Sequence, residues 1–354
     1  MPHRRPPARR LAPAFAVLAV AAAASSVPSA RAQEASAARA REAEGPGGTL
    51  VVVNKAGASA TLLDVATGRT LAEIPVGEGP HEVVVSADGS TAVVTVYGGR
   101  VPGDRLAVID VADGTLRRTI RLGEHRRPHG IAFLPGDREA LVTSESSGHV
   151  VRVDIETGDI VQALPTEQDG SHMLALAAPA GRVWTSNLGD ASLTGIDLAA
   201  GRPVQFLAVP PQPEAIGVTP DGVEVWFGSN AARSVGVAEP ASGDVEIVLE
   251  DMGRPYRTLV TPDARHVLVP DYGSDQLIVV DRAERTVRHA ITFPGGGPQG
   301  IAVADDGRTA FLSLSAVDRV ALIDLETGEV LRLLEAGPRP DGVAWSPLEA
   351  PASP

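Results

Sequence analysis

The stretch RVALIDLETGEVLRLLEAGPRPDGVAW (residues 319–345) decides the fold, because its parts recur along the chain. An apolar strand pattern ends in an acid at Asp324 and is followed by the turn sequence Glu326-Thr327-Gly328. The acid recurs at spacings of 42 to 46 residues, at Asp64, Asp110, Asp154, Asp197, Glu239 and Asp281. A period of this length indicates a repeat architecture in which each copy is one supersecondary unit.

A second landmark keeps the same period and opens an apolar strand each time. Its copies are Pro80-His81, Pro128-His129, Ser171-His172, Pro213-Glu214, Pro255-Tyr256, Pro298-Gln299 and Pro340-Asp341. An Asp-Gly or similar turn usually closes that strand. Each period therefore predicts four short strands, which is typical of a β-propeller blade.

We predict an all-β fold, a seven-bladed β-propeller of four-stranded blades over residues 48–348, with a C-terminal tail at 349–354. The chain begins its strands near 51–54 without the first strand of a blade, and it ends on such a strand near 342–345. Pairing of these N-terminal strands with the C-terminal strand would close the ring and remove its free edges.

These motifs resemble the YVTN-repeat family of seven-bladed propellers. Pro128-His129-Gly130-Ile131 and Asp324-Leu325-Glu326-Thr327-Gly328 match the family's strand opening and turn closely, whereas the naming tetrapeptide is absent. The resemblance implies the propeller fold. It does not imply one function, because the family includes ligand binders, lactonase-like enzymes and electron-transfer subunits.

The N-terminus has the order of a secretory signal peptide. Residues 1–10 are basic, Leu11 to Ala24 is apolar, and Ala30-Arg31-Ala32 supplies the small residues of a cleavage site. We predict a signal peptide at 1–32, a disordered linker at 33–47, and an exported protein that is periplasmic or extracellular. No stretch reaches the roughly 20 apolar residues that span a bilayer, so we expect no membrane insertion.

Composition excludes several classes of function. The absence of cysteine excludes disulfides and thiolate metal sites. The formal charge is −13, and it is −18 without residues 1–32, so nucleic acid is not an expected partner. Lys55 is the one lysine beside 30 arginines, which we interpret as codon bias. We also expect a monomer.

The second residue of each of these openings, such as His81 in Pro80-His81, should lie at the mouth of the central channel. The mouth is expected on the face that carries the longer loops. Reading round the ring, the predicted ligand-binding residues are His81, His129, His172, Glu214, Tyr256, Gln299 and Asp341. Arginines adjoin the same mouth at Arg126, Arg127, Arg254, Arg257 and Arg339. Of these, Arg127, Arg254 and Arg339 are predicted to hold an anionic ligand by a carboxylate or phosphate. Alternatively, the arginines are surface residues paired with Glu82, Glu124 or Asp341.

Two interpretations of the histidines stay open. His81, His129, His172 and Glu214 would suit a divalent transition metal such as Zn, Cu, Mn or Fe. Alternatively, they form a polar channel mouth filled with water. Glu145 and His149 share one loop and could form an acid–base pair, whereas Asp110 and Asp154 are expected to cap turns.

The function hypothesis is an exported binding module that holds a small anionic ligand or a metal ion at the channel mouth. One alternative is an enzyme that uses the same histidines, either a lactone hydrolase or a metal-assisted acidic-sugar lyase. Another is a scaffold that binds a protein on its loop face.

Overall fold

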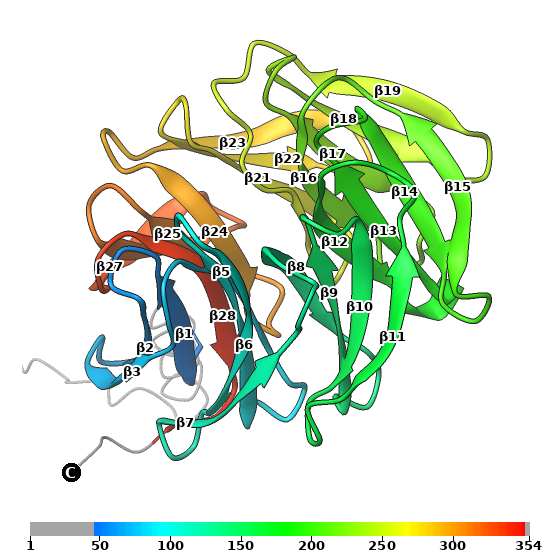
Figure 1. The fold of residues 1–354 in the computed structure, drawn as a ribbon. Coiled ribbons are helices and arrows are strands. Elements are labelled where there is room, and N and C mark those ends of the chain that lie inside the picture. The colour runs from blue at the N-terminus through cyan, green and yellow to red at the C-terminus, as the bar shows by residue number, and fades with distance from the viewer. Residues whose placement is uncertain (1–45, 351–354) are drawn as a thin grey trace, which may run out of the picture. The chain divides into compact units, whose positions relative to one another are not determined.

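The computed structural model describes residues 46–350, and these form seven four-stranded antiparallel sheets arranged as blades around a channel (Figure 1). The predicted signal peptide, and the predicted linker up to residue 45, lie outside the described residues. Twenty-eight strands and one short 3-10 helix, η1 (Ala178–Ala180), are present in the described part. The predicted all-β propeller is thus confirmed.

Each blade runs outward from the channel in four strands. Blade 1 has β28 (Pro340–Ser346), β1 (Thr49–Asn54), β2 (Ser59–Asp64) and β3 (Thr70–Pro75); blade 2 has β4 (Pro80–Val85), β5 (Thr91–Gly98), β6 (Pro102–Asp110) and β7 (Thr115–Arg121); blade 3 has β8 (Pro128–Phe133), β9 (Glu139–Ser144), β10 (His149–Asp154) and β11 (Ile160–Pro165). Blade 4 has β12 (Ser171–Ala177), β13 (Arg182–Asn187), β14 (Ser192–Asp197) and β15 (Arg202–Ala208).

The remaining blades follow the same order. Blade 5 has β16 (Pro213–Val218), β17 (Val225–Ser229), β18 (Ser234–Glu239) and β19 (Asp244–Leu249); blade 6 has β20 (Leu259–Val260), β21 (His266–Asp271), β22 (Gln276–Asp281) and β23 (Thr286–Thr292); blade 7 has β24 (Pro298–Val303), β25 (Thr309–Leu314), β26 (Arg319–Asp324) and β27 (Glu329–Glu335). Blade 6 departs from the pattern, because its innermost strand is only two residues long.

The ring closes as predicted. β28 pairs with β1 in antiparallel register, with Leu50 opposite Trp345 and Val52 opposite Val343. The two strands lie side by side in Figure 1, red against dark blue. The last innermost strand therefore completes the first blade.

The repeated acids cap turns, as expected. The Asp154 carboxylate accepts hydrogen bonds from the backbone N–H groups of Glu156 and Thr157, each at 2.9 Å. Asp324 accepts the equivalent pair from Glu326 and Thr327. These side chains satisfy backbone donors that the turn would otherwise leave open.

The core lies between the blades. Seven apolar clusters are buried in the described chain, one at each junction between neighbouring blades. At the junction of blades 7 and 1, for example, Leu50 and Leu63 pack with Phe311 and Leu322. Because every blade is packed on both sides, the channel wall is a rigid base for the residues that line it.

Candidate functional site

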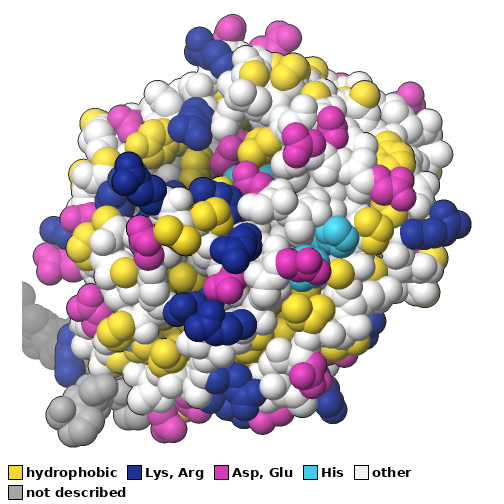
Figure 2. All heavy atoms as spheres, in the orientation of Figure 1, with side chains coloured by type: hydrophobic (Ala, Val, Ile, Leu, Met, Phe, Trp, Pro, Cys, Tyr) yellow, Lys and Arg dark blue, Asp and Glu magenta, His cyan; other side chains and the backbone are white. Residues whose placement is uncertain are grey.

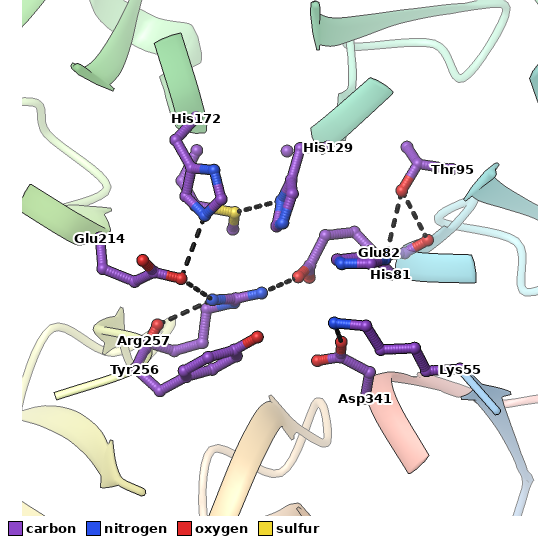
Figure 3. Close-up of polar contacts among 12 residues, drawn as sticks. Lys55, His81, Glu82, Thr95, His129, His172, Glu214, Tyr256, Arg257 and Asp341 are labelled. Carbon is purple, nitrogen blue, oxygen red and sulfur yellow. Dashed lines mark hydrogen bonds and ion pairs between the residues drawn. The ribbon is translucent and has the colours of Figure 1, made fainter. Parts of the chain in front are cut away.

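The seven predicted mouth residues lie together at the start of the innermost strands. All of them are buried, with exposed fractions of 8% or less. Figure 3 shows six of them, all except Gln299, pointing toward one another around the channel. Successive histidines are in contact: the ring centroids of His81 and His129 are 4.9 Å apart, and those of His129 and His172 are 3.9 Å apart.

Two of the three histidines are held as neutral imidazoles. Burial lowers the pKa of His81 to about 4, and burial also holds the pKa of His129 well below its usual range. His81 Nδ1 lies 2.9 Å from the Gly79 carbonyl oxygen and therefore donates its proton there, which leaves Nε2 as an acceptor. His129 Nδ1 lies 3.1 Å from the Met173 sulfur.

His172 is different, because carboxylates face both of its ring nitrogens. Nε2 is 3.1 Å from Glu214 Oε1, and Nδ1 is 3.5 Å from Glu145 Oε2. Burial alone would lower the pKa of His172, but the two carboxylates raise it to about 9. Burial likewise opposes ionisation of Glu214, yet the bond from His172 lowers the pKa of that carboxyl to about 2. At neutral pH this is a buried imidazolium between two carboxylates.

Arg257 and Glu82 form an ion pair across the channel, from blade 6 to blade 2 (Figure 3). Arg257 also donates to the Tyr256 carbonyl oxygen and lies 3.8 Å from Glu214 Oε1. Both partners border a cavity of about 260 Å³ in the lower channel, whose other lining residues are mostly apolar, such as Ile216 and Val343. The ion pair thus separates the polar mouth from an apolar lower channel. The alternative expectation of surface arginines paired with nearby acids is met for Arg257 only in its partner, Glu82, because Arg257 is buried.

Sequence reasoning missed this cross-channel pair as a unit, although a signal was present. Both residues occupy the third position of the strand opening, which is Gly or Ala in four other blades, at Gly130, Ala215, Gly300 and Gly342. A Cβ added at Gly130 would come within 2.5 Å of the Leu174 backbone nitrogen, and at Gly300 within 2.1 Å of the Asp341 carbonyl oxygen. Large side chains occur at this position only at Glu82, Met173 and Arg257, and of these only Glu82 and Arg257 are charged, which is an exception that needs a reason.

Aromatic and basic side chains form two clusters at the mouth. The chain has three tyrosines, and each lies there beneath an arginine. The Arg127 guanidinium lies 4.7 Å from the Tyr97 ring centroid, and that of Arg254 lies 5.6 Å from Tyr256 and 5.9 Å from Tyr272. The Tyr97 hydroxyl donates to Glu145 at 2.7 Å, which ties the first cluster to His172.

On the exposed surface, basic side chains lie beside acidic and histidine side chains in the middle of the face shown in Figure 2. Arg339 stands at the start of β28, and its carbonyl oxygen accepts the backbone N–H of Lys55. Lys55 Nζ in turn lies 3.4 Å from Asp341 Oδ2. The one lysine of the chain is therefore part of the mouth, and codon bias does not account for its position.

Two further expectations concern an acid–base pair and a metal site. The predicted Glu145–His149 pair is not formed: Glu145 faces Tyr97 and His172, whereas His149 Nδ1 faces the Ser147 carbonyl oxygen at 2.6 Å. The metal site stays a prediction. Within residues 46–350 no three His, Asp or Glu side chains are arranged to hold one metal ion, and both nitrogens of His172 already face carboxylates.

Comparison with known proteins supports the fold. No family model matches the chain, so membership of the YVTN-repeat family stays a prediction. Protein NirF of Pseudomonas aeruginosa is 26% identical over 320 residues, which cover 83% of this chain and 79% of that protein. No helix within the described residues is long and apolar enough to cross a membrane.

Solved structures share the architecture at low sequence identity. Hydrazine synthase of Kuenenia stuttgartiensis has a TM-score of 0.69 at 20% identity, covering 80% of this chain and 93% of that one. A functionally unknown protein of Desulfotomaculum acetoxidans has a TM-score of 0.69 at 15% identity, covering 86% and 99%. Dihydro-heme d1 dehydrogenase NirN in complex with DHE has a TM-score of 0.60 at 18% identity, covering 84% and 74%.

Proposed function

We propose that the chain is an exported propeller that binds a planar anionic ligand, of the heme-type tetrapyrrole class, over the mouth of its channel. The observation that carries this proposal is the mouth itself, in which two arginine–tyrosine clusters flank a pair of buried, neutral imidazoles. The similarity to NirF and to NirN, whose title names a dihydro-heme d1 dehydrogenase, supports the choice of ligand class. These similarities do not favour the lactone hydrolase, sugar lyase or scaffold alternatives.

The side chains of the mouth fit the chemistry of such a ligand. Tyrosine rings and guanidinium planes stack on flat conjugated systems, and the guanidinium fork binds carboxylates in two-point contacts. Arg127 and Arg254 each combine the two properties, because each lies over a tyrosine ring. We assign them the carboxylates of the ligand, with Arg339 as a third arginine that precedes an innermost strand.

The imidazoles fit the metal of such a ligand. A neutral imidazole nitrogen is a common ligand of heme iron. Nε2 of His81 is free of the Gly79 contact that fixes its Nδ1, and the low pKa keeps the ring unprotonated at pH 7. His172 is unsuited to this role, because carboxylates face both of its nitrogens.

A spectroscopic titration tests the proposal. Hemin added to the purified chain should give a shifted Soret band with saturable binding. Arg127→Gly should weaken this binding by about tenfold, as expected for loss of one charge-assisted contact. The variant suits the test because Arg127 has φ +54°, a left-handed conformation that glycine adopts at the equivalent positions Gly79 and Gly297. Its melting temperature should therefore not fall.

Two controls complete the experiment. Arg117→Ala removes an arginine that pairs with Glu156, and it should leave hemin binding unchanged. Iron-free protoporphyrin should bind more weakly than hemin if an imidazole contributes. Absence of any spectral change with either compound at micromolar concentration would overturn the proposal.

A further inference from the structure

Asp341 is a buried carboxylate whose hydrogen-bonding capacity is unused. Its exposed fraction is 0%, and neither carboxylate oxygen has a hydrogen-bond donor within residues 46–350. An ionised carboxylate can accept about four hydrogen bonds, and a buried polar group without them is costly. The other acids of the mouth are engaged, since Glu214, Glu145 and Glu82 each accept from a named side chain.

Lys55 balances the charge of Asp341 but does not satisfy it. Its Nζ lies 3.4 Å from Oδ2, close enough for attraction but not in hydrogen-bond geometry. An arginine here could bind both oxygens through its fork, whereas a lysine is a compact point charge. The chain uses arginine for 30 of its 31 basic residues, so the exception at this site leaves the acceptor atoms of Asp341 open.

The neighbours of Asp341 do not satisfy it: within residues 46–350 neither the Lys55 ammonium nor the Tyr256 hydroxyl forms a hydrogen bond to its carboxylate. The charge of Asp341 acts on both His81 and Tyr256, which lie near it on the mouth. His81 turns its protonated Nδ1 away to Gly79, so Nε2 presents a second acceptor. Figure 3 shows Asp341 and Lys55 pointing into the channel, across the mouth from His172. This side of the mouth therefore has open acceptors, whereas Glu214 on the other side accepts hydrogen bonds from His172 and Asn230.

We propose that Asp341 is the receptor for a hydrogen-bond-donating group, a hydroxyl or an ammonium, carried by the bound ligand. The inference rests on the proposed function for placing a ligand at the mouth, and it adds a requirement to that ligand. Its anionic group meets Arg127 or Arg254, and a donor group on the same molecule reaches Asp341.

Three matched probes test the subsite by competition with hemin and by direct calorimetry. They are 4-methylbenzoate, 4-(hydroxymethyl)benzoate and 4-(aminomethyl)benzoate, which share a ring and a carboxylate and differ in one group. The unmodified chain should bind at least one donor-bearing probe about tenfold more tightly than the methyl compound, as expected for a hydrogen bond to a charged acceptor. Whichever of the two donor probes is preferred identifies the group.

Two isosteric or near-isosteric variants assign the effect. Asp341→Asn should abolish the preference for donor probes and leave the affinity for 4-methylbenzoate equal or higher. Lys55→Gln should increase the preference for the aminomethyl probe, because the carboxylate then lacks its counter-charge. If instead Lys55→Gln weakens all three probes and Asp341→Asn strengthens all three, Lys55 is the receptor for the ligand's anion and the proposal is wrong.

The outcomes distinguish failure of this inference from failure of the proposed function on which it rests. Equal binding of all three probes, or binding of hemin that none of them displaces, overturns the donor subsite and leaves the proposed function standing. Failure of hemin itself to bind overturns the proposed function. The comparison among probes on the unmodified chain is decisive even if a variant folds poorly.

Discussion

At the scale of single residues, His172 carries a buried positive charge that balances two carboxylates of the mouth. Its imidazolium is buried between Glu214 and Glu145, and removing one partner of a buried pair leaves an uncompensated charge. His172→Gln should therefore destabilise the chain by about 3 kcal/mol at neutral pH, a magnitude typical of such losses. Differential scanning calorimetry of the two proteins measures the difference.

The pH dependence of that difference gives the prediction its sign. The pKa of His172 is raised from 6.5 to about 9, so its stabilising effect is complete below pH 6.5 and is lost as the pH rises through about 9. The pKa of Glu214 is lowered from 4.5 to about 2, so its effect is complete above pH 4.5 and is lost as the pH falls toward 2. The gap in melting temperature between the unmodified chain and His172→Gln should shrink between pH 7 and 10. A constant gap over that range would show that His172 is not charged in the folded protein.

At the scale of strands, the Arg257–Glu82 pair joins the opening of β4 to the segment before β20. Each single substitution, Arg257→Met or Glu82→Gln, leaves the other partner without its main contact and should cost about 3 kcal/mol. The double variant should melt at a higher temperature than Arg257→Met, because it removes both members of the pair. If the two losses simply add, the residues are not coupled across the channel.

The strands also show what the sequence could and could not predict. The repeated acids and Pro-x steps predicted the blades, the closure and the seven mouth positions, because each landmark is a local turn or strand opening with its own backbone chemistry. Glu82 was one of three candidate partners for the arginines, and Arg257 and Glu82 each depart from the small residue usual at their position. Their contact across the channel was not predictable, since the partners are 175 residues apart and no local pattern links them. Lys55 follows β1 and Tyr97 lies near the end of β5, both outside the repeated landmarks, so their part in the mouth required the structure.

At the scale of the whole molecule, one strand at the C-terminus closes a ring begun at the N-terminus. β28 pairs with β1 and packs against β24 and β4, the innermost strands of the blades on either side. It also carries Asp341 and so builds part of the mouth. Deleting residues 341–354 would open the edge of β1 and expose the apolar junctions between blade 1 and its neighbours, including Leu50 and Val52.

The truncated chain should therefore aggregate or melt far below the full chain, and it should lose hemin binding in the same step. Thermal denaturation and light scattering of the purified proteins measure the first effect, and the Soret titration measures the second. The matched control is deletion of residues 351–354, which follow Ala350 in the sequence and so leave the hydrogen bond from the Ala350 backbone N–H to the Thr49 hydroxyl oxygen in place. If the 341–354 deletion melts at the same temperature as the full chain, ring closure does not carry the stability of the propeller.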